Sequence, residues 1–315
     1  MAKWIRPSTR EFVREAKAIP GFSWFDFVHG YIYSRWPYFY IGMATGEHRL
    51  ARIAAPLVAW IGKLLERDAQ REAKDTEGRV TFADTYHGKV VPLEAASQLV
   101  TIHEDISIPD LEQVIPYTRA RAIIMHNPEH IVALDCPCRM ARENPCLPLD
   151  VCLIVGEPFA SFILEHQPAH AREISPDEAV DILKAEDDRG HVHHAFFKDA
   201  MLGRFYAICN CCSCCCGAMQ AQRNGTPMLA ASGYRCQVDA QLCQGCGVCA
   251  DSCQFSALTL VDGTMTVDRS ACMGCGVCVS KCAHGALALT RDEEKGIPLE
   301  IKTLLEQAAD AAVTR

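Results

Sequence analysis

The sequence predicts an α+β protein with a mainly helical N-terminal and cysteine-rich region, then a unit of pseudo-twofold symmetry, then a C-terminal helix. Three observations support this prediction. Helical spacing of apolar residues recurs before residue 234, between short apolar runs that are typical of strands. A stretch that begins at Cys243 repeats 29 residues later from Cys272. Apolar residues then follow one helical face over residues 298–313.

Composition excludes several classes of protein. The chain has 315 residues, 49% of them hydrophobic, so it can form a large core. Its formal net charge of -8 argues against a nucleic-acid binder, and it has no Gly-x-Gly-x-x-Gly or Walker sequence for a nucleotide. Lys3 and Arg6 are followed by more charged residues instead of an apolar signal sequence. We therefore expect a cytoplasmic protein, in which cysteines act as metal ligands before they form disulfides.

Residues 1–80 predict an aromatic, basic and amphipathic docking segment. The first 40 residues contain 12 of the 24 aromatic side chains, and residues 1–80 hold 13 Lys and Arg against 9 Asp and Glu. Apolar residues from Leu50 to Leu65 have helical spacing, with Pro56 as a kink or start. The segment could lie on an anionic membrane surface, which would make the protein membrane-associated. The alternative is that it packs over the cysteine-rich region or against a partner subunit.

Residues 81–233 predict a cysteine-rich α/β domain. Helical spacing appears over residues 92–103 and 116–127, each with proline near the start. Ser175 and Glu178 form a capping box for a helix that Gly190 ends. Residues 131–134 and 191–197 have the apolar character of strands. The histidines of residues 190–194 could bind metal or move protons, but surface or strand-edge histidines are commoner.

Residues 234–292 contain the strongest motif, two runs of Cys-x2-Cys-x2-Cys-x3-Cys followed by a closing segment at 293–315. The first run is Cys243, Cys246, Cys249 and Cys253, and the second is Cys272, Cys275, Cys278 and Cys282. This spacing lets three thiolates surround one face of an iron–sulfur cube. Two zinc knuckles are the alternative, but zinc needs four thiolates from two short loops and not two runs of four.

These runs resemble those of two-[4Fe-4S] bacterial-type ferredoxin domains, with Asp262-Gly263 as a hairpin turn. The resemblance implies two [4Fe-4S] clusters, each completed by the fourth cysteine of the other run. Cluster A would be held by Cys243, Cys246, Cys249 and Cys282, and cluster B by Cys272, Cys275, Cys278 and Cys253. The proline that usually follows each fourth cysteine is replaced by Gln254 and Ala283. Lys281 and His284 flank the fourth ligand of cluster A, whereas Asp251 lies near that of cluster B, and this predicts the higher reduction potential for cluster A.

A second set of cysteines indicates one or two further iron–sulfur clusters. Its candidate ligands are Cys136, Cys138, Cys146, Cys152, Cys209, Cys211, Cys212, Cys214, Cys215 and Cys216, whereas Cys236 stands alone as a spare thiol. In an extended chain, Cys209, Cys211 and Cys215 would face one way and Cys212, Cys214 and Cys216 the other. Two clusters on opposite sides of this loop would then be completed by the four earlier cysteines. A structural zinc site and buried spare thiols are the alternatives.

The stretches around residues 135–139, 148–152 and 208–216 are similar to poorly characterised bacterial and archaeal 4Fe-4S binding proteins. That resemblance supports iron–sulfur clusters but supplies no substrate. We therefore expect an electron-transfer protein that relays single electrons through several clusters to or from a partner, such as a flavoprotein or another oxidoreductase subunit. The alternatives are a reductase subunit with a substrate-accessible cluster in the cysteine-rich domain and, less favoured, a redox sensor.

Overall fold

A long, mostly antiparallel sheet forms the centre of the protein in the computed structural model, which describes residues 5–19, 23–51, 86–108, 111, 114 and 122–313. The sheet has eight strands, in the order β2-β3-β4-β7-β6-β1-β8, with β5 paired to β3. Only β1 and β8 pair in parallel within that order. The strands are β1 (Tyr86–Val91), β2 (Ile106–Ile108), β3 (Ile123–Leu134), β4 (Cys152–Glu157), β5 (Ala171–Ile174), β6 (Val192–Lys198), β7 (Arg204–Cys211) and β8 (Leu229–Ala230).

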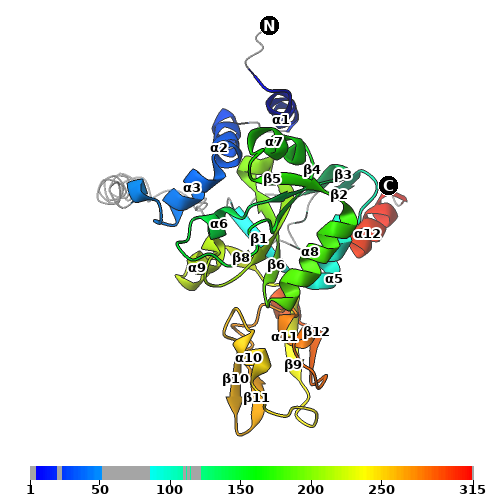
Figure 1. Ribbon diagram of the computed structural model, residues 1–315. Helices are drawn as coiled ribbons and strands as arrows, with labels where there is room; N and C mark the ends of the chain where they lie inside the picture. The colour runs from blue at the N-terminus through cyan, green and yellow to red at the C-terminus, as the bar shows by residue number, and fades with distance from the viewer. Residues whose placement is uncertain are drawn as a thin grey trace, which may run out of the picture.

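One face of this sheet is covered by three helices, α5 (Leu93–Val100), α8 (Pro176–Asp188) and α12 (Ile301–Val313), as Figure 1 shows. Their apolar side chains share a core with the sheet residues that face them, such as Ala195 and Phe197 of β6. The capping box forms as expected, because the Ser175 hydroxyl accepts a hydrogen bond from the Glu178 backbone. The helix ends before Gly190, whose φ of +81° favours glycine.

The other face carries the cysteines and is covered by the N-terminal helices. Phe12 of α1 (Pro7–Ala18) is buried against α7 (Phe159–His166), and α2 (Trp24–Arg35) packs on the turn η2 (Asp199–Met201). Helix α3 (Pro37–Ala44) packs against the short helix α6 (Pro137–Met140), and α9 (Gly217–Arg223) closes the same side. The described part of residues 1–80 therefore packs over the cysteine-rich region; most of the expected helix over residues 50–65 lies outside the described residues.

Two expectations about this region are corrected. Residues 122–134 do not continue a helix: they form a bridge and the long strand β3, so the described part of the helix expected over residues 116–127 is extended. The cysteine-rich region is also built on a sheet instead of being mainly helical. Apolar residues of β3 alternate between the two faces only in part, which weakened the strand signal in the sequence.

The repeat unit, residues 234–292, projects from one end of the sheet as a narrow stem (Figure 1). Its halves correspond at the expected offset, since α10 (Val248–Asp251) matches α11 (Val277–Ser280) and β10 (Leu258–Val261) matches β12 (Leu287–Arg291). Strand β10 pairs with β11 (Thr264–Val267) around the Asp262-Gly263 turn, and β12 pairs with β9 (Tyr234–Val238). The turn η3 (Glu293–Lys295) then leads to α12, the closing helix.

Candidate metal centres

The repeat unit gathers the two cysteine runs around its own small core. Cys243, Cys249, Cys253, Cys272, Cys278 and Cys282 belong to this core, together with Cys236. The fourth cysteine of the first run, Cys253, lines one cavity with Cys272, Cys275 and Cys278 of the second run. This placement matches the exchange of fourth ligands that the ferredoxin resemblance implies. Cys246 of the first run is exposed.

Backbone N–H groups point at the sulfurs in a pattern that follows the repeat. Ala257 donates to Cys253 Sγ and Ala286 donates to Cys282 Sγ, each with an N···S distance of 3.3 Å. Such bonds stabilise negative charge on a cluster and its thiolates. Gly245 and Gly274 occupy equivalent positive-φ positions, where a Cβ would lie 2.4 Å from Gly263 O and 2.1 Å from Tyr234 O. The close backbone approach expected of these glycines is therefore present.

Residues 242–286 match the family model of the 4Fe-4S dicluster domain. No curated protein matches the chain. The thiol cavity, the paired N–H···S bonds and the glycine positions all fit two such clusters in this dicluster domain. Cys236, expected to be a spare thiol, lines the cluster-B cavity as a fifth cysteine and hydrogen-bonds to the Cys278 thiol.

Six other cysteines on the covered face of the large sheet are linked by thiol hydrogen bonds and are called here the hexad: Cys136, Cys138, Cys152, Cys209, Cys211 and Cys216. Cys212 and Cys215 line the same cavity but are not linked to the six in this way. Sheet register brings two of them together, because Cys152 of β4 lies directly opposite Cys209 of β7. Cys136 hydrogen-bonds to Cys138 and Cys152, and Cys216 bonds to Cys138 and Cys211. The bond from Cys138 and burial raise the pKa of Cys136 to about 12. A metal cluster would supply the positive charge that these thiols need to ionise.

The remaining four cysteines of this region form the quartet: Cys146, Cys212, Cys214 and Cys215. Their sulfurs all lie within 4.8 Å of one another. Cys212 and Cys215 are buried, whereas Cys214 is exposed at the rim. Burial and hydrogen bonds from Cys214 and Cys212 raise the pKa of the Cys146 thiol. The quartet therefore also needs a cation if its sulfurs are to be thiolates.

The expected division of the cysteine loop by alternating faces is wrong. Cys209 and Cys211 both belong to the hexad, as expected for residues on one face of the strand. Cys216 also belongs to the hexad, whereas Cys215 belongs to the quartet. Strand β7 ends at Cys211, and residues 213–215 form a turn that breaks the alternation. The completing cysteines were expected from the earlier motifs: Cys146 completes the quartet, and Cys136, Cys138 and Cys152 complete the hexad.

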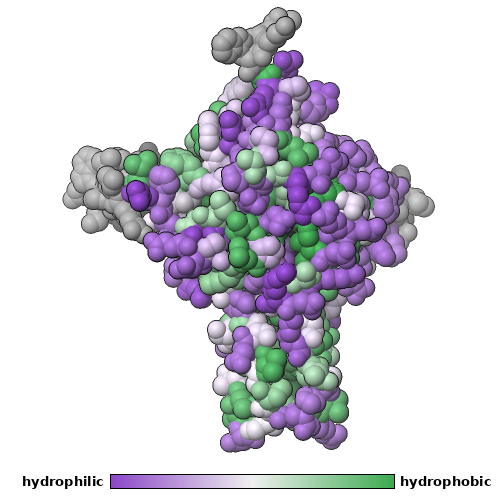
Figure 2. Space-filling view, in the orientation of Figure 1, coloured by the Kyte–Doolittle hydropathy of each residue, from purple (hydrophilic) through white to green (hydrophobic). Residues whose placement is uncertain are grey.

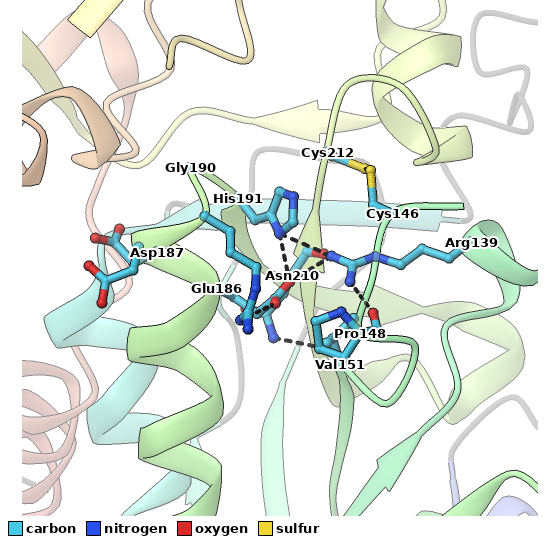
Figure 3. A network of polar contacts seen from close by, with 12 residues as sticks. Arg139, Cys146, Pro148, Val151, Glu186, Asp187, Gly190, His191, Asn210 and Cys212 are labelled. Carbon is cyan, nitrogen blue, oxygen red and sulfur yellow. Dashed lines mark hydrogen bonds and ion pairs between the residues drawn. The ribbon is translucent and has the colours of Figure 1, made fainter. Parts of the chain in front are cut away.

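A buried polar network holds the strands of the hexad in register (Figure 3). Arg139 follows Cys138 and is 1% exposed. Its guanidinium donates to Glu186, with an N···O distance of 2.6 Å, to Asn210 O at 3.1 Å, and to Pro148 O. The Asn210 amide in turn donates to Val151 O at 2.8 Å. Pro148, Val151 and Asn210 lie in or next to the segments that carry Cys146, Cys152, Cys209 and Cys211, so this network positions those cysteines.

The network is ionic, because the fully buried Glu186 pairs with the guanidinium groups of Arg139 and Arg189. Burial alone would raise the pKa of Glu186, but hydrogen bonds from His191 and Arg139 lower it. His191 Nδ1 lies 2.6 Å from Glu186 Oε2. The histidines of residues 190–194 thus have in part a structural role. His193 Nδ1 also forms a hydrogen bond with Asn210 Oδ1, at a distance of 2.6 Å. His194 lies across the β6–β7 ladder from Cys209, and burial lowers its pKa to about 3.

A cavity of about 180 Å³ opens beside the hexad, between the sheet and helices α2 and α3. Lys198 lines its far side and is 1% exposed. The ammonium lies 3.6 Å from the centre of the Tyr33 ring and 4.7 Å from that of Tyr40. Burial lowers the pKa of Lys198 to about 7. Sequence reasoning missed this lysine, because only the fold places it near the cysteines.

Gln254 connects the dicluster domain to the cysteine loop. Its side-chain oxygen accepts from the Ser213 backbone at 2.8 Å, and its side-chain nitrogen donates to Gly190 O at 2.9 Å. Phe255 and Met273 pack beside Gln254 against the core that contains the hexad. The cavity lined by Cys253, Cys272, Cys275 and Cys278 therefore faces the body of the protein, since Phe255 and Met273 also line it. The unusual residue after Cys253 was visible in the sequence, but its partners were not.

Proposed function

We propose that this chain is an electron-transfer protein in which the hexad accepts or supplies electrons through the dicluster domain. Clusters of this kind exchange single electrons when bound. The match of residues 242–286 to the dicluster domain supports the electron-transfer function in general. The observation that carries the specific proposal is the Gln254 contact, which joins the loop after Cys253 to the loop between Cys212 and Cys214. The hexad would hold one further iron–sulfur cluster on four of its six thiolates.

The outer end of the stem is the proposed docking site for a protein electron donor or acceptor. Cys246 of the stem is exposed, and Figure 2 shows apolar residues on the surface of this lower part. The exposed apolar residues are Leu242, Val248, Leu260 and Val261, with exposures of 45% to 48%. Exposed apolar side chains in the same domain as an exposed cysteine suit a transient partner that needs a short distance to the cluster. We expect this partner to be a flavoprotein or another oxidoreductase subunit.

An anaerobic redox titration followed by electron paramagnetic resonance tests the proposal. The full chain should show reversible one-electron steps from both clusters of the dicluster domain and from the hexad. Cys246→Ser should remove or alter one step, and Cys152→Ser should alter a different one. Protein free of iron and acid-labile sulfide after strictly anaerobic purification would contradict the proposal.

A second candidate function is reduction of a small molecule at the hexad, and the cavity beside Lys198 favours it. A buried ammonium can donate a hydrogen bond or a proton to a bound molecule, and its lowered pKa suits transfer near neutrality. Cyanide is a useful probe, because it binds iron that has an open position. A change in the resonance spectrum of the hexad on adding cyanide would support the reductase; an unchanged spectrum would favour simple relay.

A further inference from the structure

The quartet differs in shape from the other cysteine groups. Cys146 Sγ lies 3.2 Å from Cys214 Sγ and 3.6 Å from Cys212 Sγ, and Cys214 Sγ lies 3.7 Å from Cys215 Sγ. Every sulfur pair in the group is within 4.8 Å. The four thiols therefore surround a space with room for little more than one atom.

These distances match one tetrahedral ion. Four thiolates that each lie about 2.3 Å from a single zinc ion are about 3.8 Å from one another, by the geometry of the tetrahedron. In a cubane, each thiolate binds a different iron at a different corner, so the four sulfurs must stand farther apart. The observed contacts fall near the single-ion value.

The dicluster domain provides an internal comparison. It matches a 4Fe-4S family, so its cysteines show the spacing that this fold gives to cubane ligands. Among the residues that the structure describes, the four sulfurs of the quartet form a group in which all ligand atoms lie within 4.8 Å of one another. The described cysteines of the dicluster domain do not form such a group. The quartet is thus more compact than the cluster sites of the same chain.

Side chains fix the loop that carries three of the four sulfurs. Arg142 donates to Cys215 O at 3.1 Å, Gln220 donates to Cys214 O at 2.9 Å, and Arg223 donates to Ser213 O. Four thiolates around a divalent ion carry a net charge of about -2, and two arginines beside the loop offset part of it. The carbonyl bonds also orient the loop, as is usual for the groups around a metal's own ligands.

We propose that Cys146, Cys212, Cys214 and Cys215 bind one zinc ion as a tetrahedral four-thiolate site, and that no iron–sulfur cluster forms there. The ion would tie the loop after Met140 to the loop after β7 and so hold the mouth of the hexad closed next to Gln254. This proposal does not depend on the electron-transfer function.

Zinc-edge X-ray absorption of the unaltered, anaerobically purified chain tests the geometry. We expect about one zinc per chain with four sulfur neighbours at about 2.3 Å and no iron neighbour. Absence of zinc from protein that carries its full iron would overturn the proposal.

Variants provide the second test. Cys146→Ser combined with Cys214→Ser should remove the zinc and leave iron and sulfide unchanged, whereas the control Cys246→Ser should change the iron signals and leave zinc in place. Loss of about four iron and four sulfide from the double variant would show a cubane and overturn the proposal. The dicluster resonance signals report folding of the double variant, and circular dichroism reports folding of Cys246→Ser. If the double variant fails to fold, the zinc-edge result on the unaltered chain decides.

Discussion

Arg139 has a structural role at the site, because its guanidinium is buried and ion-paired beside the loops of the hexad. Its partners include the carboxylate of Glu186 and the carbonyl groups of Pro148 and Asn210. Removing one member of a buried ion pair leaves the other charge without compensation. Substitution of Arg139 should therefore both lower the stability of the fold and displace the cysteines of the hexad.

Arg139→Gln should lower the free energy of unfolding by about 3 to 5 kcal/mol, measured by anaerobic denaturant titration. Arg172→Gln is the matched control, since Arg172 pairs with Asp150 and Glu178 but is 47% exposed. Its loss should cost less than about 1 kcal/mol. Equal effects of the two substitutions would contradict the role assigned to Arg139.

Some residues of the site could be predicted from sequence and others could not. The dicluster ligands follow from local spacing, which survives any tertiary arrangement. The division of the cysteine loop could not be predicted, because the turn at residues 213–215 places Cys215 and Cys216 in different groups. Lys198 and the partners of Gln254 depend on strand register and domain contact, which leave no short-range signal.

At the scale of elements, His166 connects α7 to the N-terminal helices. Its Nε2 lies 2.9 Å from Thr9 Oγ1 of α1, and its ring stacks on Phe162. Burial, followed by Arg6 and Arg35, lowers the pKa of His166 to about 4. Because a detached helix would let this histidine regain its ordinary pKa near 6.5, protonation favours detachment.

Docking of α1 and α2 should therefore be strongest above about pH 6.5 and weaken as the pH falls toward 4. The fluorescence of Trp24 and Trp36, both on or beside α2, can follow this change. His166→Gln should flatten the pH dependence between these limits. A dependence that persists unchanged in the variant would assign the titration to another group.

The Gln254 contact joins two elements that carry metal ligands, and the repeat offers a matched control for it. The ferredoxin resemblance implies that the backbone after each fourth cysteine accepts proline. Gln254→Pro should remove both side-chain hydrogen bonds, lower the free energy of unfolding by about 1 to 3 kcal/mol and slow electron exchange between cluster B and the hexad. Ala283→Pro, at the exposed equivalent position, should change neither.

Freeze-quench resonance spectroscopy after rapid reduction can compare these two variants. The expected result is delayed reduction of the hexad in Gln254→Pro alone. Equal rates of hexad reduction in the two variants would show that electron transfer to the hexad does not depend on the Gln254 contact.

The two clusters of the dicluster domain should differ in reduction potential. Lys281 lies beside Cys282 of cluster A, although it also pairs with Asp188 at 3.8 Å. Cluster B has the buried Asp187 near Cys278, and this carboxylate adds to the negative charge there. We expect cluster A to be reduced first, and Asp187→Asn should narrow the gap in a redox titration. A reversed order would contradict this electrostatic account.

At the scale of the whole molecule, the N-terminal helices leave much apolar surface exposed while they cover the hexad. Trp24, Phe25, Trp36 and Phe39 are between 47% and 78% exposed. None of the helices within the described residues is long and apolar enough to cross a membrane. The membrane contact expected for residues 1–80 stays a prediction, for which flotation of the full chain with anionic vesicles is the measurement.

The metal content of the whole chain tests the proposals for the dicluster domain, the hexad and the quartet together. The dicluster domain should hold eight iron atoms, the hexad about four and the quartet none, which gives about 12 iron and one zinc. Elemental analysis with sulfide determination checks this sum. About 16 iron without zinc would restore the sequence-based expectation of two extra clusters.

The fold class could be predicted at the scale of the whole molecule, but the central sheet could not. The repeat and the closing helix could be predicted from the sequence because their patterns are local. The eight-stranded sheet was missed, since β3 combines long apolar runs with polar breaks at residues 126–130 that resemble neither period. The sequence predicts a strand at residues 131–134, and their pairing with β4 and β5 confirms this. Residues 123–130 extend the strand without a sequence signal of either period.

The ladder between β9 and β12 brings the entry and exit of the dicluster domain side by side, with Tyr234 opposite Arg291. A module whose two ends meet can be cut out, exchanged or inserted while its host keeps its own path. Replacing residues 234–292 with another dicluster domain should therefore leave the remaining fold intact, and on the proposed function it would change which protein exchanges electrons with the chain.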